Sequence, residues 1–137
     1  MTVPLKSCIK INHEWDIVEA RQLGRDIARN LGFGTVDQAR ITTAISELAR
    51  NIYLYAGRGE LRFEVIELVN QKGICLSAID DGPGIKDISL AMQDGYTTSG
   101  GLGTGLPGVK RLMDEFDVKS EVGKGTKIKT IKWVRHK

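Results

Sequence analysis

Two polar side chains, Glu47 and Asn51, are four residues apart in a stretch whose apolar residues recur at helical spacing. On a helix this spacing places both side chains on one face, about one turn apart. A carboxylate there could accept a proton from an attacking hydroxyl, and a carboxamide oxygen could bind Mg²⁺. The same pair is also typical of a solvated helix face, so the pair alone does not define a site.

Three glycine-rich turns follow this helix, at residues 80–85, 100–106 and 123–126. In the first, Asp80 stands at the end of a predicted strand and precedes Gly-Pro-Gly. Its carboxylate could shape the turn, which is the simpler interpretation when the residue is taken alone. It could instead accept a hydrogen bond from an exocyclic amine, the contact that would fix adenine in an otherwise apolar pocket.

The second glycine run, residues 100–105, precedes a predicted helix. Glycines allow backbone N–H groups to approach an anion, and the helix start adds the positive end of its dipole. The run could equally be a flexible loop with a helix cap. It is neither a dinucleotide fingerprint nor a Walker A motif, because no βαβ unit precedes it and no Gly-Lys-Ser/Thr follows.

The order of these patterns is more specific than any one of them. Glu-x-x-x-Asn, Asp-x-Gly-x-Gly, Gly-x-Gly-x-Gly and Gly-x-Gly-Thr follow one another within residues 35–131. This series resembles the N, G1, G2 and G3 boxes of the Bergerat-fold (GHKL) ATP-binding superfamily, which contains gyrase, the heat-shock chaperone, histidine kinases and MutL. Blocks 41–53 and 101–114 are similar to the switch serine/threonine kinases of the bacterial stressosome.

The resemblance implies ATP and Mg²⁺ as cofactors and assigns a role to each motif residue. Glu47 would be the catalytic base, Asn51 the Mg²⁺ ligand and Asp80 the adenine partner. The remaining nucleotide-binding positions would shape the base pocket (Gly82, Gly84), cradle the phosphates (Gly101, Gly103, Gly105) or complete the last box (Thr126).

One position departs from the superfamily pattern. Many histidine kinases carry a Lys or His shortly after the N-box Asn, whereas this chain has Leu54 and Tyr55. The positive charge that faces the phosphates must then come from elsewhere. Lys110 and Arg111, on the helix after the second glycine run, are the candidates.

The resemblance also implies a function and partners. It predicts an ATP-dependent protein serine/threonine kinase that phosphorylates STAS-domain antagonist and scaffold proteins and, when released, binds and activates a metal-dependent phosphatase. The main alternative is an anti-sigma factor of the same fold that sequesters a sigma factor. A stand-alone ATPase is a further alternative. The catalytic half of a histidine kinase is disfavoured, because neither His13 nor His136 lies in a helical dimerisation segment.

The periodicity predicts which elements carry these motifs. Strands are expected at 6–11, 61–69, 74–79, 118–122 and 127–134, and helices at 16–31, from 35 to Gly57, and after the second glycine run. A short helical piece near 88–92 lies in a segment that we interpret as a mobile lid. The order β-α-α-β-β-lid-α-β-β indicates an α+β, two-layer sandwich, a mixed sheet with three helices on one face.

Local signals give further expectations about helix starts and burial. Residues 16–19 and 35–38 resemble capping boxes. The apolar arc of the second helix includes Tyr55, and Glu47 and Asn51 lie on its rim. A rim position would half-bury the Glu47 carboxylate between core and cleft, where its pKa could be tuned.

Length and composition set the remaining limits. The 137 residues predict a single domain, 1–137, and a net charge of +3 is only mildly basic. The C-terminal lysines are interpreted as one solvated strand face, so no nucleic-acid partner is expected. Cys8 and Cys75 lie in predicted strands with apolar neighbours and are expected to be buried, reduced thiols. Without a signal peptide or a membrane-spanning stretch, we expect a cytoplasmic protein with no membrane partner.

Overall fold

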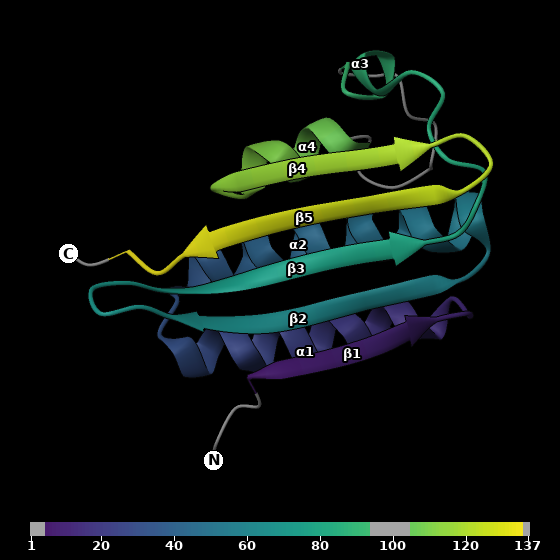
Figure 1. The fold of residues 1–137 in the computed structure, drawn as a ribbon. Helices are drawn as coiled ribbons and strands as arrows, with labels where there is room; N and C mark the ends of the chain where they lie inside the picture. Colours follow the sequence, from purple (N-terminus) through teal and green to yellow (C-terminus); the bar gives the residue numbers. More distant parts are fainter. Residues whose placement is uncertain (1–4, 94–104, 136–137) are drawn as a thin grey trace.

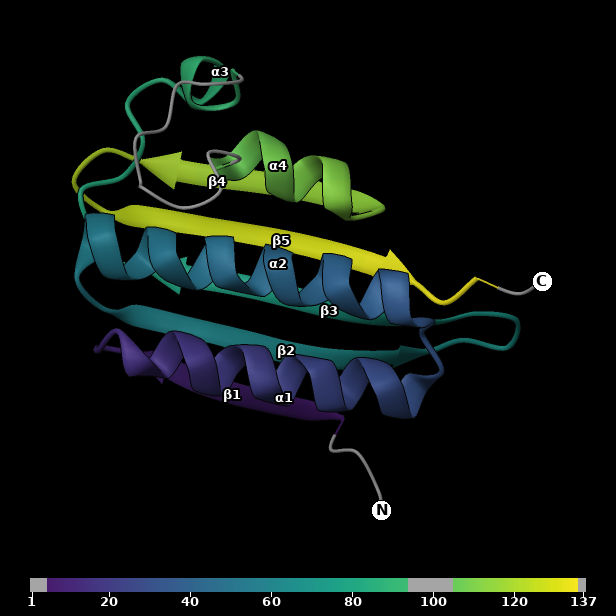
Figure 2. The ribbon, with the colours of Figure 1, turned by 180° about the vertical axis from the view of Figure 1, so that it is seen from behind.

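Residues 5–93 and 105–135 are described by the structure, which is a computed structural model. One five-stranded sheet, in the order β1-β2-β3-β5-β4, carries helices on one face (Figures 1 and 2). The strands are β1 (Lys6–Ile11), β2 (Gly59–Glu67), β3 (Lys72–Asp80), β4 (Glu115–Glu121) and β5 (Gly125–Trp133). The helices are α1 (Trp15–Leu31), α2 (Thr35–Asn51), a π-helical turn η1 (Ile52–Ala56), α3 (Ile88–Ala91) and α4 (Gly105–Leu112). The predicted α+β, two-layer arrangement and its element order are confirmed.

The prediction of a mixed sheet is wrong, because every strand pair in the described residues is antiparallel. The reason is the number of times the chain crosses the molecule between strands. Two antiparallel helices, α1 and α2, connect β1 to β2, so β2 returns in the direction opposite to β1 (Figure 2). Two short hairpins then reverse β3 against β2 and β5 against β4.

The core lies between the sheet and the helices. Alternate side chains of the strands face the helices, among them Phe63 of β2 and Leu76 of β3, and both are buried. From the helix side, Ile41, Ile45 and Leu48 of α2 are completely buried. Helix α2 runs along the middle of the sheet, so its C-terminal end lies near the C-terminal end of β3 (Figure 2).

Helix ends follow the predictions only in part. Gly32, with φ of 97°, ends α1 in the left-handed conformation as expected. The capping box at Asp16 is absent, because α1 begins at Trp15 without a side-chain cap, and the Asp16 Oδ2 instead accepts from the backbone N–H groups of Asn12 and His13. The capping box at Thr35 is absent, because α2 begins after Gly34 without a side-chain cap.

Two expectations about exposure need correction. The C-terminal lysines do not share one solvated face: Lys127 and Lys129 are exposed, whereas Lys132 is 3% exposed and donates to the backbone oxygen of Leu112 at 2.8 Å. The even-numbered residues of β5 face the helices, which explains the difference. Cys75 is buried as predicted, but Cys8 is exposed on the outward side of β1.

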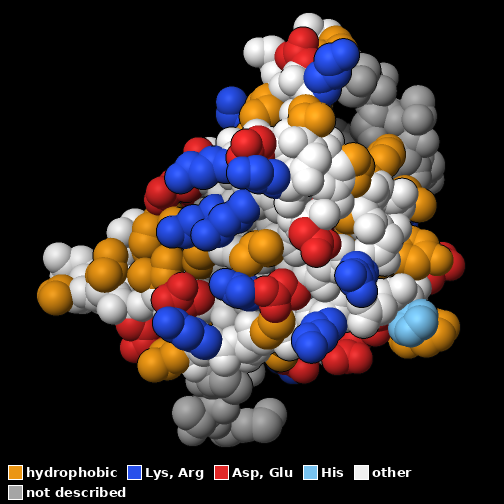
Figure 3. All heavy atoms as spheres, turned by 45° about the vertical axis from the view of Figure 1, so that its right-hand side comes forward, with side chains coloured by type: hydrophobic (Ala, Val, Ile, Leu, Met, Phe, Trp, Pro, Cys, Tyr) orange, Lys and Arg blue, Asp and Glu red, His pale blue; other side chains and the backbone are white. Residues whose placement is uncertain are grey.

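Basic and acidic side chains are interspersed on the face shown in Figure 3. Within residues 5–93 and 105–135, no helix combines the length and apolar character needed to cross a membrane.

Candidate functional site

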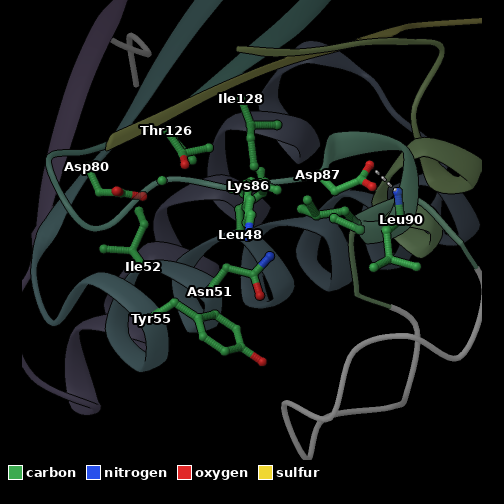
Figure 4. Close-up of a pocket in the computed structure, with 15 residues that line it drawn as sticks. Leu48, Asn51, Ile52, Tyr55, Asp80, Lys86, Asp87, Leu90, Thr126 and Ile128 are labelled. Carbon is green, nitrogen blue, oxygen red and sulfur yellow. Dashed lines mark hydrogen bonds between the residues drawn. The ribbon is translucent and has the colours of Figure 1, made fainter. Parts of the chain in front are cut away.

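A cavity of about 530 Å³ lies at the end of the sheet where α2 and β3 finish (Figure 4). Its size is typical of small-molecule sites. Its wall comes from five separate parts of the chain: the end of α2 with η1, the end of β3, the segment from Gly84 to Ala91, the start of α4, and β5. The first glycine-rich turn and the N-box helix therefore meet at one place, as the motif order predicts.

Apolar side chains form most of the wall, and a few polar groups converge on it. Leu48, Ile52, Ala78, Ile85, Leu106 and Ile128 supply the apolar surface. Asn51, Asp80 and Thr126 supply predicted polar groups (Figure 4). An apolar slot with one carboxylate acceptor suits a flat heterocycle that carries an amine, and an adjacent carboxamide suits a metal–phosphate group.

Asp80 is the half-buried carboxylate of this cavity. Desolvation raises the pKa of its carboxyl group above the ordinary value, while backbone hydrogen bonds from Gly82 and Thr126 oppose that rise. The Gly82 N–H donates to Oδ1 at 2.9 Å, so Asp80 does shape the turn. A carboxylate has about four acceptor positions, so these two backbone hydrogen bonds leave capacity for a ligand. The two interpretations of Asp80 are compatible.

Thr126 stands directly opposite Asp80 in the β3–β5 register. Its hydroxyl is 2.8 Å from the Oγ of Ser120, and that same Oγ accepts from the backbone N–H of Ile85 at 2.6 Å. The cavity wall from β5 is thus connected through Ser120 to the loop that contains the first glycine-rich turn. Sequence reasoning did not single out Ser120, because only strand pairing brings β4 to this loop.

The predicted pocket-shaping glycines lie in that loop. Gly84 lines the cavity with φ of 80°, and a side chain there would collide with the backbone oxygen of Glu121. Gly82 lies against Ala56 of η1, where a Cβ would stand 2.6 Å from the Ala56 Cβ. Both positions need glycine for close packing of protein against protein.

Asn51 lines the cavity, whereas Glu47, one turn earlier on α2, is buried and is not among the residues that line it. Its side chain is 2% exposed rather than half-buried. Oε1 is 3.9 Å from the Arg50 guanidinium, and Oε2 has no hydrogen-bond partner in the described part of the chain. A buried carboxylate oxygen without a partner costs stability, so Glu47 is not there to stabilise the fold.

Two features of the wall were not anticipated. The turn after Asn51 is π-helical, and it carries Tyr55 onto the cavity with 52% of the residue exposed, so the prediction of Tyr55 as a core residue is wrong. Lys86 and Asp87 also line the cavity (Figure 4). Short π-helical turns often occur at functional sites, but their position depends on tertiary packing.

The second glycine run is only partly described. Gly105 begins α4 and is buried, with φ of 52°. Gly101 and Gly103, and residues 94–101 of the segment 84–101 that we interpret as a lid, fall outside the described residues. The candidate cations Lys110 and Arg111 lie on exposed positions of α4, and neither lines the cavity.

Comparison with known proteins agrees with this geometry. The family described as histidine kinase-, DNA gyrase B-, and HSP90-like ATPase matches residues 36–135, a range that contains all four motifs. The chain belongs to this ATPase family. The predicted Bergerat fold is therefore confirmed, and the family is one of ATP-binding proteins.

Within this family, the chain is similar to a serine/threonine-protein kinase and to anti-sigma factors. The serine/threonine-protein kinase RsbT of Bacillus subtilis (strain 168) is 65% identical over 130 residues, covering 95% of this chain and 98% of the relative. The anti-sigma F factor of Thermoanaerobacter sp. (strain X514) is 33% identical over 100 residues, or 70% of each chain. The predictions of an RsbT-type protein and of a serine/threonine-protein kinase are confirmed.

Proposed function

We propose that this kinase binds ATP–Mg²⁺ in the cavity and phosphorylates a serine or threonine of a STAS-domain antagonist or scaffold protein. The observation that carries the proposal is the half-buried Asp80 carboxylate in an apolar cavity that also contains Asn51. Similarity over 95% of the chain to a protein named as a serine/threonine-protein kinase supports it.

Each site residue has a task in this proposal. Asp80 accepts from the adenine amine, and Thr126 with Ser120 holds the opposite wall. The Asn51 carboxamide oxygen holds Mg²⁺, a hard cation that binds oxygen ligands. Bound ATP supplies the phosphoryl group. Phosphoryl transfer depends mainly on positioning of the reacting groups and on stabilisation of charge, so few other protein groups are needed.

Glu47 is the proposed base. It lies one turn from Asn51 on α2, and its unpartnered Oε2 is able to accept a proton from an acceptor hydroxyl. Because its side chain is 2% exposed and does not line the cavity, this role requires the acceptor hydroxyl to enter beside Leu48 and Asn51, the cavity residues nearest to Glu47 in the sequence, and the side chains around Glu47 to move aside.

The partner switch is the second part of the proposal. When released from the antagonist, the kinase binds and activates a metal-dependent phosphatase. Similarity to anti-sigma F factors favours a second candidate, in which the chain sequesters a sigma factor and its kinase activity modifies an antagonist of that complex.

Labelled ATP incubated with the kinase and candidate STAS proteins tests the first function. We expect label on the STAS protein, and none when Mg²⁺ is removed by a chelator. A parallel pull-down with a sigma factor and with a phosphatase distinguishes the two switches. ADP release at an equal rate with and without any protein acceptor would contradict the proposal and indicate a stand-alone ATPase.

A further inference from the structure

Three charged side chains line the cavity within the described residues: Asp80, Asp87 and Lys86. Both carboxylates already accept a backbone hydrogen bond. Asp80 accepts from Gly82, and Asp87 caps α3 by accepting from the Leu90 N–H at 3.1 Å. Lys86 makes no hydrogen bond or ion pair within the part of the chain that the structure describes. Its ammonium group is therefore available to a ligand.

The backbone beside Lys86 is fixed, although its side chain is free. The N–H of Ile85 donates to Ser120, and the N–H of Gly123 donates to the backbone oxygen of Pro83 at 2.9 Å. These bonds hold the loop against the β4–β5 turn. A lysine on a fixed backbone keeps a flexible stem with a compact charge at its end, which suits contact with a charged group whose position varies.

Lys86 and Asp80 line the same cavity without pairing with each other. Lys86 forms no ion pair with the Asp80 carboxylate in the described residues. Figure 4 draws Lys86 between Asp80 and Thr126 on one side and Asp87 and Leu90 on the other. A ligand whose base contacts Asp80 would extend its phosphates into this central part.

A bound triphosphate needs more positive charge than the described wall otherwise offers. Leu54 and Tyr55 replace the basic residue expected after Asn51, and Lys110 and Arg111 do not line the cavity. The start of α4 contributes a partial positive charge from its dipole. Lys86 is the one side-chain cation on the wall within the described residues.

We propose that Lys86 binds the phosphate groups of the nucleotide and supplies the cationic contact that this chain lacks after Asn51. The inference rests on the proposed function, because it assumes that the cavity binds ATP. A charge-assisted contact of this kind strengthens with each added phosphate and contributes little to binding of the base alone.

Calorimetric titration of ATP, ADP and adenosine tests the role of Lys86. We expect Lys86→Gln to weaken ATP binding by about tenfold or more, to weaken ADP less, and to leave adenosine unchanged. Lys86→Arg retains the charge and is expected to restore most of the ATP affinity. Raising the ionic strength is expected to reduce ATP affinity more in the wild type than in Lys86→Gln, because salt screens the charge.

Two further variants serve as comparisons. Lys72→Gln makes the same charge change at an exposed position at the opposite end of β3 and is expected to leave all three affinities unchanged. Lys110→Gln tests the competing cation on α4. Thermal melting of each variant without nucleotide checks that folding is intact.

The possible outcomes separate the two proposals. Equal losses for ATP and adenosine in Lys86→Gln, or a selective ATP loss in Lys110→Gln instead, would overturn the phosphate-binding role while leaving the nucleotide site intact. Failure of the wild type to bind any of the three ligands would overturn the proposed function and, with it, this inference.

Discussion

At the residue scale, the burial of two carboxylates sets what each can do. Glu47 is almost completely enclosed with one oxygen unpartnered, whereas Asp80 is half-buried and receives backbone hydrogen bonds. A partly solvated acceptor can exchange its hydrogen bonds for those of a ligand. A buried carboxylate without a hydrogen-bond partner lowers the stability of the fold, and such groups are typical of catalytic sites.

Replacing Asp80 by Asn should have opposite effects on stability and on binding. The folded-state pKa is raised, so the folded protein binds more protons than the unfolded chain between the two pKa values. The free energy of unfolding therefore falls as pH rises through the folded-state pKa. Asp80→Asn removes the desolvated charge, so the nucleotide-free variant should be slightly more stable than wild type at neutral pH. The higher stability of the Asp80→Asn variant should disappear below about pH 3.9, the unperturbed pKa of an Asp side chain.

The same substitution should weaken ATP binding by about 1–3 kcal/mol, because a carboxamide offers a poorer acceptor to the adenine amine. Denaturation at several pH values and titration with ATP and GTP measure both effects. Equal affinity of the wild type for ATP and GTP would contradict the adenine role of Asp80. A variant less stable than wild type at neutral pH would show that its turn contact outweighs the desolvation.

Replacing Glu47 by Gln should separate chemistry from binding. The carboxamide keeps the shape of the side chain and removes its basicity, so we expect phosphoryl transfer to fall by about 10²–10⁴-fold. Folding, ATP affinity and retention of the STAS partner should stay close to wild type. Glu67→Gln, at an exposed position at the far end of β2, is the matched control. Undiminished transfer to the acceptor would exclude Glu47 as the base.

At the element scale, the placement of α1 against α2 depends on one close approach. Gly24 of α1 faces the Ile45 side chain of α2, and a Cβ added at Gly24 would overlap the Ile45 Cδ1. Ile45 is completely buried, so its δ-methyl group has little room to move. Because α2 carries Glu47 and Asn51, this contact contributes to the position of the site.

A double-mutant cycle tests that contact. Gly24→Ala gains helix propensity of about 1 kcal/mol but creates overlap that costs about 1–3 kcal/mol, so the single variant should be neutral or destabilised. Ile45→Val removes the overlapping methyl group and, made alone, costs about 0.5–1.5 kcal/mol. In the Ile45→Val background, Gly24→Ala should become stabilising. Chemical denaturation of the four proteins measures the coupling, and additive effects would show that the overlap is relieved by other movements.

At the scale of the whole molecule, the cavity joins parts of the chain that are distant in sequence, so a ligand there should stabilise the fold. ATP with Mg²⁺ should raise the melting temperature as the nucleotide concentration increases. At an ATP concentration 100 times Kd, the free energy of unfolding should increase by about 2.7 kcal/mol. Asn51→Ala should lose the Mg²⁺-dependent part of this shift and keep the metal-free part. Equal loss with and without Mg²⁺ would indicate that Asn51 is structural.

The sequence by itself determined the elements and the motif order. Gly32 ends α1 where the glycine predicts, and β1 has its predicted bounds. These features depend on local signals: helical periodicity, β-branched runs and glycines at turns. Residues within one motif are close together in the folded protein because they are close together in the sequence.

Only the tertiary structure decided which side chains share an environment. The burial of Glu47 and Lys132, the exposure of Cys8 and the entry of Lys86 into the cavity each depend on which side of an element faces its neighbours. Strand pairing sets Thr126 opposite Asp80, and the π-helical turn after Asn51 contains the exposed Tyr55. These contacts join residues far apart along the chain, and no local pattern specifies them, because their free energy exists only once the layers have packed together.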